Sequence, residues 1–326
     1  MLIARKLVVF WLFIGVLLVS CRTANGKSKI IPTPSSTIGT ITSATPTRMP
    51  TIVLPSPNPT VLPTILPLSD EEAYSLLSDM LHPGTTCELP CWLNATPGRS
   101  FLTDVYFEWA PLLGITATYT DFPSTGKGSM DFIYKTDNYS LKIFTNYVIS
   151  PSTEVFESIE VMTEVTHYLG NDNFEYAYTA EINKNILSDY LLPNLLSAYG
   201  PPAQILISME IISAEPTSPD FFSVWLLYPT RGAIVRYEGS ADVEEDIIHG
   251  CPSGTFVSLW LVNPANVKLY ENTLKDATGH SDIVTGSPYY KSTMEAIGMS
   301  AEEFYEVFKN PTERCIESPL DIWPEP

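Results

Sequence analysis

Residues 85–98 read TTCELPCWLNATPG, and this stretch decides how the folded part of the chain is held together. Cys87 and Cys91 are separated by three residues, with Pro90 directly before the second cysteine and Trp92 directly after it. Such a pair can be a metal clip, a redox dithiol or a structural disulfide. Zinc sites and thioredoxin-like motifs favour two residues between their cysteines, so the spacing argues against both. We therefore expect a disulfide around a rigid turn, provided that this part of the chain lies in an oxidising compartment.

The N-terminal residues indicate such a compartment. Arg5 and Lys6 precede an apolar run of 13 residues, 7–19, and Cys21 follows shortly after it. A transmembrane helix needs about 20 apolar residues, so residues 1–20 are better explained as a signal peptide. The ending Leu-Val-Ser-Cys resembles a bacterial lipobox, which implies lipidation of Cys21, cleavage before it and anchoring to a membrane by acyl chains. We expect a lipid-anchored protein of the cell envelope that faces outside the cytoplasm; the alternatives are an uncleaved anchor and a signal peptide cut elsewhere.

Residues 21–68 are predicted to form a disordered tether behind the lipidated cysteine. Of the 47 residues from 22 to 68, 24 are proline, threonine or serine, and the apolar residues follow neither a helical nor a strand period. Such a segment cannot bury enough apolar surface to offset the entropy of ordering it. Extended as polyproline II, it would reach on the order of 150 Å and hold the folded domain away from the membrane.

Residues 69–326 are predicted to form one acidic extracytoplasmic domain. The whole chain has 37 acidic and 18 basic residues, and six of the basic residues but none of the acidic ones precede residue 69. The domain therefore carries 12 basic and 37 acidic residues, a net charge of −25. Binding of nucleic acid requires a basic face, so we expect no nucleic-acid partner. An acidic surface suits solubility, cations or a basic partner.

Helix and strand patterns alternate along this domain, and the strands are in the majority. Apolar stripes with capping residues predict helices at 69–81, 100–113, 185–202 and 298–310. Runs with alternating apolar residues predict strands at 115–120, 129–136, 139–148, 154–165, 203–212, 220–229, 232–239 and 254–262. A loop is expected after residue 262, and irregular chain after residue 310. These patterns predict an α+β fold in which helices pack on an antiparallel sheet. An internal repeat of helix plus strands would divide it into units 69–184 and 185–326.

Neither a catalytic motif nor a metal-binding motif stands out in the sequence. The four histidines, His82, His167, His249 and His280, lie far apart, and G-x-S-x-G, P-loop and dinucleotide-binding patterns are absent. The acidic stretches 238–246 and 171–175 contain oxygens that calcium could use, but neither has the EF-hand spacing. We therefore predict no catalytic residue, no metal and no cofactor.

The cysteines of the mature chain predict two disulfides. Besides Cys21 there are four, Cys87, Cys91, Cys251 and Cys315, and an even number in an exported domain allows three pairings. We favour Cys87 with Cys91 and Cys251 with Cys315. The second bond closes a loop of about 65 residues and would stabilise the fold by about 4 kcal/mol in the chain-entropy model.

Two resemblances bear on function. Leu-rich helices that end at a glycine before antiparallel strands resemble, weakly, the β-lactamase-inhibitor-protein type of fold, which several envelope lipoproteins use for protein contact. The segments CELPCWLNATPG, YGPP and GMSAEEFY, with the ending CIESP and a tryptophan, are similar to uncharacterised lipoproteins of Chloroflexi-type bacteria. This second resemblance implies a shared fold and no known activity.

We therefore expect a non-catalytic, membrane-anchored module that binds a protein partner in the envelope. One alternative is an exported hydrolase that acts on carbohydrate or peptide through acidic residues. Another is a calcium-dependent module.

Overall fold

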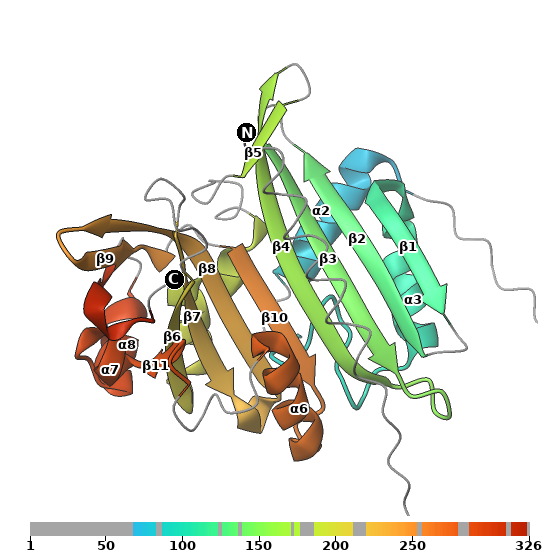
Figure 1. The fold of residues 1–326 in the computed structure, drawn as a ribbon. Coiled ribbons are helices and arrows are strands. Elements are labelled where there is room, and N and C mark those ends of the chain that lie inside the picture. Colours follow the sequence, from blue (N-terminus) through green and yellow to red (C-terminus); the bar gives the residue numbers. More distant parts are fainter. Residues whose placement is uncertain are drawn as a thin grey trace, which may run out of the picture. The chain divides into compact units, whose positions relative to one another are not determined.

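The computed structural model describes residues 68–82, 87–122, 126–135, 139–170, 173–176, 186–210, 220–252, 256–279, 287–310 and 314–324. These residues belong to one compact unit, Leu62–Pro326. The predicted signal peptide, Cys21 and most of the predicted tether lie outside the described residues, as does His280. The described part is an α+β fold with six α-helices and one twelve-stranded antiparallel sheet (Figure 1).

Two sets of four antiparallel strands build the middle of the sheet. The first set is β1 (Thr116–Phe122), β2 (Lys127–Lys135), β3 (Tyr139–Ile149) and β4 (Phe156–Gly170). The second set is β6 (Gln204–Glu210), β7 (Asp220–Tyr228), β8 (Ala233–Glu244) and β10 (Phe256–Val262). The strand order β1-β2-β3-β4-β10-β8-β7-β6-β11 joins the sets through β4 and β10, so that each set runs outward from this seam.

Each set of strands follows a helix, while the division into units 69–184 and 185–326 stays a prediction. Helix α2 (Asp70–Leu81) and α3 (Leu102–Trp109) precede the first set, and α5 (Leu192–Tyr199) precedes the second. Four short strands complete the sheet: β5 (Asn173–Tyr176), β9 (Ile247–Gly250), β11 (Tyr290–Ser292) and β12 (Ile316–Pro319). The remaining helices are α6 (Val267–Thr278), α7 (Thr293–Ile297) and α8 (Ala301–Phe308).

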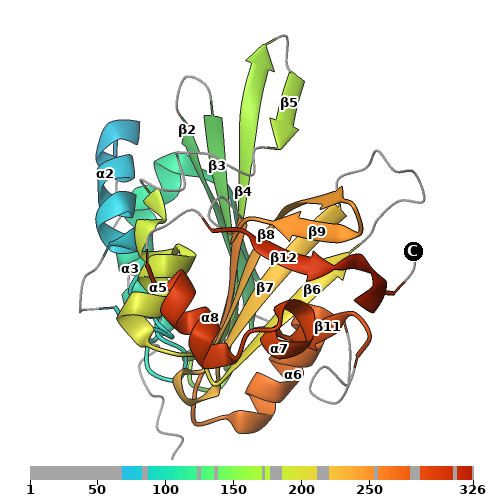
Figure 2. The same ribbon diagram turned by 90° about the vertical axis from the view of Figure 1, so that its left-hand side faces the viewer.

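The larger of two apolar cores lies on the face of the sheet that carries α2, α3 and α5 (Figure 2). Burial alternates strictly along most of β3, because successive side chains of a strand point to opposite faces. Trp109 of α3 lies in this core, with its ring centroid 6.0 Å from that of Tyr147 in β3 and 5.9 Å from that of Phe156 in β4. The core also contains Leu196 of α5 and Phe304 of α8, so both sets of strands share it.

The smaller core lies on the opposite face, over the second set of strands only. Tyr270 and Leu274 of α6 pack there against a group that includes Trp225 of β7 and Trp260 of β10. In β10, Leu259 belongs to the larger core while its neighbour Trp260 belongs to the smaller one, which confirms that the two cores occupy opposite faces. Helix α6 therefore covers one part of this face.

The prediction of one continuous helix over residues 185–202 is wrong. The structure has a 3₁₀ helix, Ser188–Tyr190, followed by α5, and Leu191 between them is extended with ψ near 147°. Pro193 explains the break, because proline has no N–H to donate to the carbonyl of residue 189 and its ring would clash with that carbonyl in a continuous helix, whereas it is tolerated in the first turn of α5. In α3 the N-cap is Phe101 and not Ser100, whose hydroxyl instead accepts a hydrogen bond from the backbone N–H of Thr96.

Two predictions of irregular chain are also wrong. The expected loop after residue 262 contains α6, whose buried stripe is only Tyr270, Leu274 and Thr278, too narrow for a clear periodic signal. The side chain of Asn266 caps its first turn, and Gly279 ends it with φ at 68°. The expected irregular tail contains β12, which pairs with β9. A strand of four residues carries too little pattern to be recognised without its partner.

Gly232 is the position where a side chain is least tolerable. It has φ of 63° in the turn between β7 and β8, and a Cβ atom there would overlap the carbonyl oxygen of Val262. We expect Gly232→Ala to lower the free energy of unfolding by about 3 kcal/mol or more, from left-handed strain plus overpacking. Gly279→Ala is the matched control, because φ there is 68° but no atom lies within 4 Å. Gly279→Ala should lower the free energy of unfolding, measured with urea, by only about 1 kcal/mol. Equal losses of stability for the two variants would contradict the close packing of Gly232 against the Val262 carbonyl.

Candidate functional site

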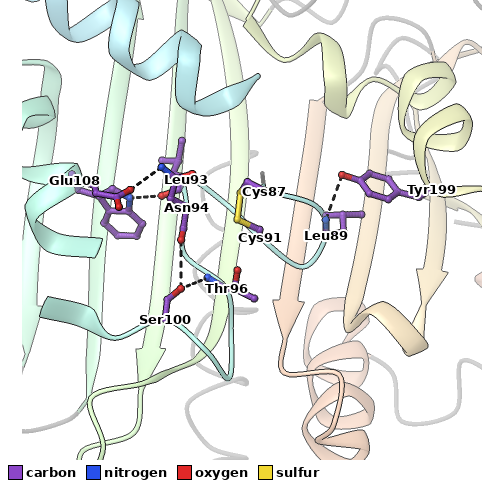
Figure 3. The surroundings of a disulfide bond; sticks show 10 residues. Cys87, Leu89, Cys91, Leu93, Asn94, Thr96, Ser100, Glu108 and Tyr199 are labelled. Carbon is purple, nitrogen blue, oxygen red and sulfur yellow. Dashed lines mark hydrogen bonds between the residues drawn. A yellow bond between two sulfur atoms is a disulfide. The ribbon is translucent and has the colours of Figure 1, made fainter. Parts of the chain in front are cut away.

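The stretch around Cys87 and Cys91 is a buried loop that is closed by a disulfide. The two cysteines are buried and form a disulfide with a Cα–Cα distance of 5.1 Å (Figure 3). Trp92 is 1 % exposed, and its indole Nε1–H donates to the Thr145 hydroxyl at 3.3 Å. The Trp92 ring also meets Tyr190 edge-on, with 5.1 Å between centroids. This loop thus contacts both β3 and the 3₁₀ helix Ser188–Tyr190.

The second disulfide joins two exposed cysteines far apart in sequence. Cys251 and Cys315 are 64 positions apart, with a Cα–Cα distance of 4.0 Å. Cys251 directly follows β9, and Cys315 directly precedes β12. Both bonds have the pairing favoured from sequence. Because all four cysteines are bonded, none of them has a free thiol in this structure.

The described histidines do not come together. His167 stacks on Tyr139, with 4.8 Å between ring centroids, and His249 lies 3.8 Å from a carboxylate oxygen of Glu317. His82 is hydrogen-bonded to Ser188. Within the described part of the chain, no group of three or more histidine, cysteine or acidic side chains could hold a metal ion.

The two acidic stretches considered for calcium differ in how much of them is described. Most of 238–246 belongs to β8, and it ends in a tight turn at Glu245 and Asp246, which both have positive φ. Of the second stretch, residues 171 and 172 lie outside the described residues. Among the helices that the structure describes, none has the length and apolar character needed to cross a membrane.

A polar surface on the sheet is the best candidate for a functional site, and we call it the open face. It is the side of β2, β3, β4, β10 and β8 that points away from α2 and α3, and in Figure 1 no described helix lies in front of β1–β4. Its side chains are half-buried, apart from the buried Ser258. They are Ser129, Asp131, Ile133, Lys142, Phe144, Asn146, Glu160, Met162, Glu164, Arg236, Glu238 and Ser258.

Strand register arranges these side chains in rows across the sheet. Phe144 of β3 lies opposite Met162 of β4, Met162 lies opposite Ser258 of β10, and Ser258 lies opposite Arg236 of β8. In the same row, Asp131 of β2 lies opposite Phe144. Directly opposed residues on one face are within contact distance, so this row joins strands from both units across the seam.

Arg236 is the fixed cation of the open face. Its guanidinium carbon lies 5.4 Å from the Trp225 ring centroid and 5.6 Å from the Trp260 ring centroid. The two tryptophan rings stack on each other, with 5.5 Å between their centroids. One terminal nitrogen lies 3.2 Å from Glu238, and the other donates to the Ser258 hydroxyl at 3.5 Å. Among the described residues, its Nε–H has no hydrogen-bond partner. Cation–π contact and the ion pair together hold this side chain in one position.

The carboxylates of the open face outnumber its cations. Glu160 accepts hydrogen bonds from Trp260 Nε1 at 2.9 Å and from Asn146 Nδ2 at 3.2 Å, which fix it without neutralising it. The described residues give Glu164 neither an ion pair nor a hydrogen bond. Lys142 lies 3.8 Å from Asp131, and partial burial raises the pKa of the Asp131 carboxyl although the lysine opposes this. Four acidic and two basic side chains leave the open face negatively charged.

Comparison of the chain with protein-family models, with curated proteins and with solved structures gave no match. The two resemblances inferred from sequence motifs therefore remain predictions. Sequence reasoning did not select the open face, although it placed each strand of the face approximately. The signal was the alternate polar positions of β3 and β4, where Lys142, Asn146, Glu160 and Glu164 stand between buried apolar residues.

Proposed function

We propose that this chain is a lipoprotein anchored to a membrane of the cell envelope through Cys21. Its folded part is a module that binds a protein partner on the open face, outside the cytoplasm. The predicted signal peptide, lipobox and tether support the anchoring. The observation that carries the binding role is the excess of carboxylates, Glu160 and Glu164 in particular, on a sheet surface held rigid by hydrogen bonds.

The partner that fits this surface presents a basic, extended segment. Opposite charge on the partner would steer its approach and reject acidic competitors. Phe144 and Met162 supply an apolar centre between the charged positions, and methionine adapts its shape to the group it contacts. Because Arg236 and Glu160 are already held by their neighbours, little side-chain entropy is lost when the partner binds.

The alternative of an acid-dependent hydrolase finds no support on the open face. Glycoside hydrolysis uses two carboxylates that flank the bond being broken. Glu160 and Glu164 point the same way from a single strand, and Met162 lies between them. They form part of a surface and do not face each other across a cleft.

A photo-crosslinking amino acid at position 162 tests the binding role. With full-length protein in its native envelope, we expect the Met162 replacement to form a covalent adduct with one protein. The same replacement at Met294, which is 56 % exposed on α7, is the matched control and should not form that adduct. Reversing one charge with Glu164→Lys should reduce the adduct at least about tenfold, because like charges oppose each other across the interface.

A second charge reversal controls for a general effect of lost acidity. Glu302→Lys changes an exposed carboxylate in the first turn of α8 and should leave the adduct unchanged. Equal adduct yields from positions 162 and 294 would contradict the assignment of the open face. So would an adduct at position 162 that is insensitive to Glu164→Lys.

A further inference from the structure

A serine and a histidine from distant parts of the sequence meet on the helical side of the sheet. His82 is the C-cap residue of α2, and Ser188 begins the 3₁₀ helix before α5. The Ser188 hydroxyl oxygen lies 2.8 Å from His82 Nε2, and both side chains are half-buried. The open face does not include either residue.

The hydrogen bonds of His82 define which of its nitrogens carries the proton. Nδ1 lies 2.8 Å from the backbone carbonyl oxygen of Ser78. A carbonyl oxygen only accepts, so in the neutral ring Nδ1 must hold the proton and donate it. Nε2 then has a free lone pair, and the Ser188 hydroxyl must donate to it. This is the arrangement by which a histidine activates a serine nucleophile, with a carbonyl in place of the usual orienting carboxylate.

The surroundings of Ser188 hold its hydroxyl in place. Its backbone carbonyl accepts hydrogen bonds from the Asn194 side chain at 2.9 Å and from the Leu191 N–H at 3.2 Å. Among the described residues, the other acceptor within reach of its hydroxyl is the exposed Asp189 carboxylate, at the longer distance of 3.4 Å. While His82 is neutral, the shorter bond to Nε2 is the stronger one.

A pocket lies near this pair, although neither His82 nor Ser188 is among the residues that line it. It has a volume of about 300 Å³, and Ser78 and Ile186 belong to its lining, as do the rings of Tyr74 and Tyr134. The carbonyl of Ser78 orients His82, and Ile186 lies two residues before Ser188. The volume is at the lower end of the range for small-molecule sites, and the two tyrosine rings, 4.8 Å apart, give it apolar walls.

We infer that Ser188 is an activated nucleophile, with His82 as its general base, that accepts an acyl group from a small ester. The Ser188 oxygen attacks the ester carbonyl while its proton passes to His82 Nε2. The bond from the carbonyl carbon to the alkoxy oxygen then breaks, and His82 returns the proton to the departing alcohol. Water, activated by the same nitrogen, releases the acid and restores Ser188. This inference goes beyond the proposed binding role and does not depend on it.

A fluorophosphonate probe tests the inference on the full-length protein in detergent. The Ser188 oxygen would form a bond to phosphorus, fluoride would leave, and the serine proton would pass through His82 to solvent. Peptide mass spectrometry should locate the label on Ser188, and Ser188→Ala should abolish it. His82→Gln should slow labelling at least about 100-fold, the usual contribution of a general base.

Matched controls separate a lost base from a damaged fold. His249→Gln makes the same replacement at another half-exposed histidine and should leave the labelling rate unchanged. Added imidazole should restore part of the labelling of His82→Ala, which a purely structural histidine would not allow. If His82 variants do not fold, labelling of Ser188 in the unaltered protein, and its absence in Ser188→Ala, decides. An unlabelled Ser188, or a labelling rate that does not change with His82→Gln, would overturn the inference and leave the binding role of the open face untouched.

Discussion

Trp92→Ala is expected to lower the free energy of unfolding by about 3–5 kcal/mol, the range for removal of a large buried aromatic side chain. The indole is 1 % exposed and fills the space between the Cys87–Cys91 loop, β3 and the 3₁₀ helix. Its loss would create a cavity and leave the fully buried Thr145 hydroxyl without its donor. Urea unfolding followed by far-ultraviolet circular dichroism measures the effect.

Trp92→Phe separates the two contributions. Phenylalanine keeps much of the ring contact with Tyr190 but cannot donate to Thr145. We expect it to cost about 1–3 kcal/mol, the penalty for a buried polar group that loses its partner. If Trp92→Ala lowered the free energy of unfolding by less than about 1 kcal/mol, Trp92 would not be packed between β3 and the 3₁₀ helix in the way the structure shows.

Removal of the Cys251–Cys315 disulfide by Cys251→Ala with Cys315→Ala should lower the free energy of unfolding by about 4 kcal/mol. The bond closes a long loop, since the cysteines are 64 positions apart, and long loops gain most in the chain-entropy model. It also fixes β12 beside β9, where only four residue pairs join the strands. Denaturant unfolding of the double variant, compared with the unaltered protein, tests this.

The Cys87–Cys91 pair provides the control for loop length. These cysteines are only four positions apart, so the same model gives about 2 kcal/mol for their bond. Cys87→Ala with Cys91→Ala should therefore cost less, although both residues are buried. A larger loss for the short loop than for the long one would contradict the entropic account and indicate that packing of the buried sulfur atoms dominates.

The sequence predicted most of the sheet because its strands carry strong periodic patterns. The alternation along Tyr139–Ile149, for example, reflects one buried and one half-exposed face, and each of the eight longer strands was expected near its observed place. The helices predicted at 69–81 and 298–310 are also confirmed, and each begins with a capping box, at Ser69 and at Ser300. A local pattern suffices for these elements, because their stabilising partners lie within four residues.

Features that depend on contacts between distant residues could not be predicted. The short strands β9 and β12 stabilise each other and carry little pattern of their own. The stacking of Arg236 on Trp225 and Trp260 needs three strands in register. The contact between His82 and Ser188 joins residues 106 positions apart, and no motif in the sequence links them.

Hydroxyl-radical footprinting of the full-length protein tests the central claim, that the open face is the binding surface, most directly. Methionine side chains react readily, and the chain offers Met162 in the centre of the open face and Met294 away from it on α7. The account predicts that oxidation of Met162 is several-fold slower in the native envelope than in purified protein, while oxidation of Met294 is unchanged. Equal oxidation of Met162 in the two preparations, with protection elsewhere or nowhere, would contradict it.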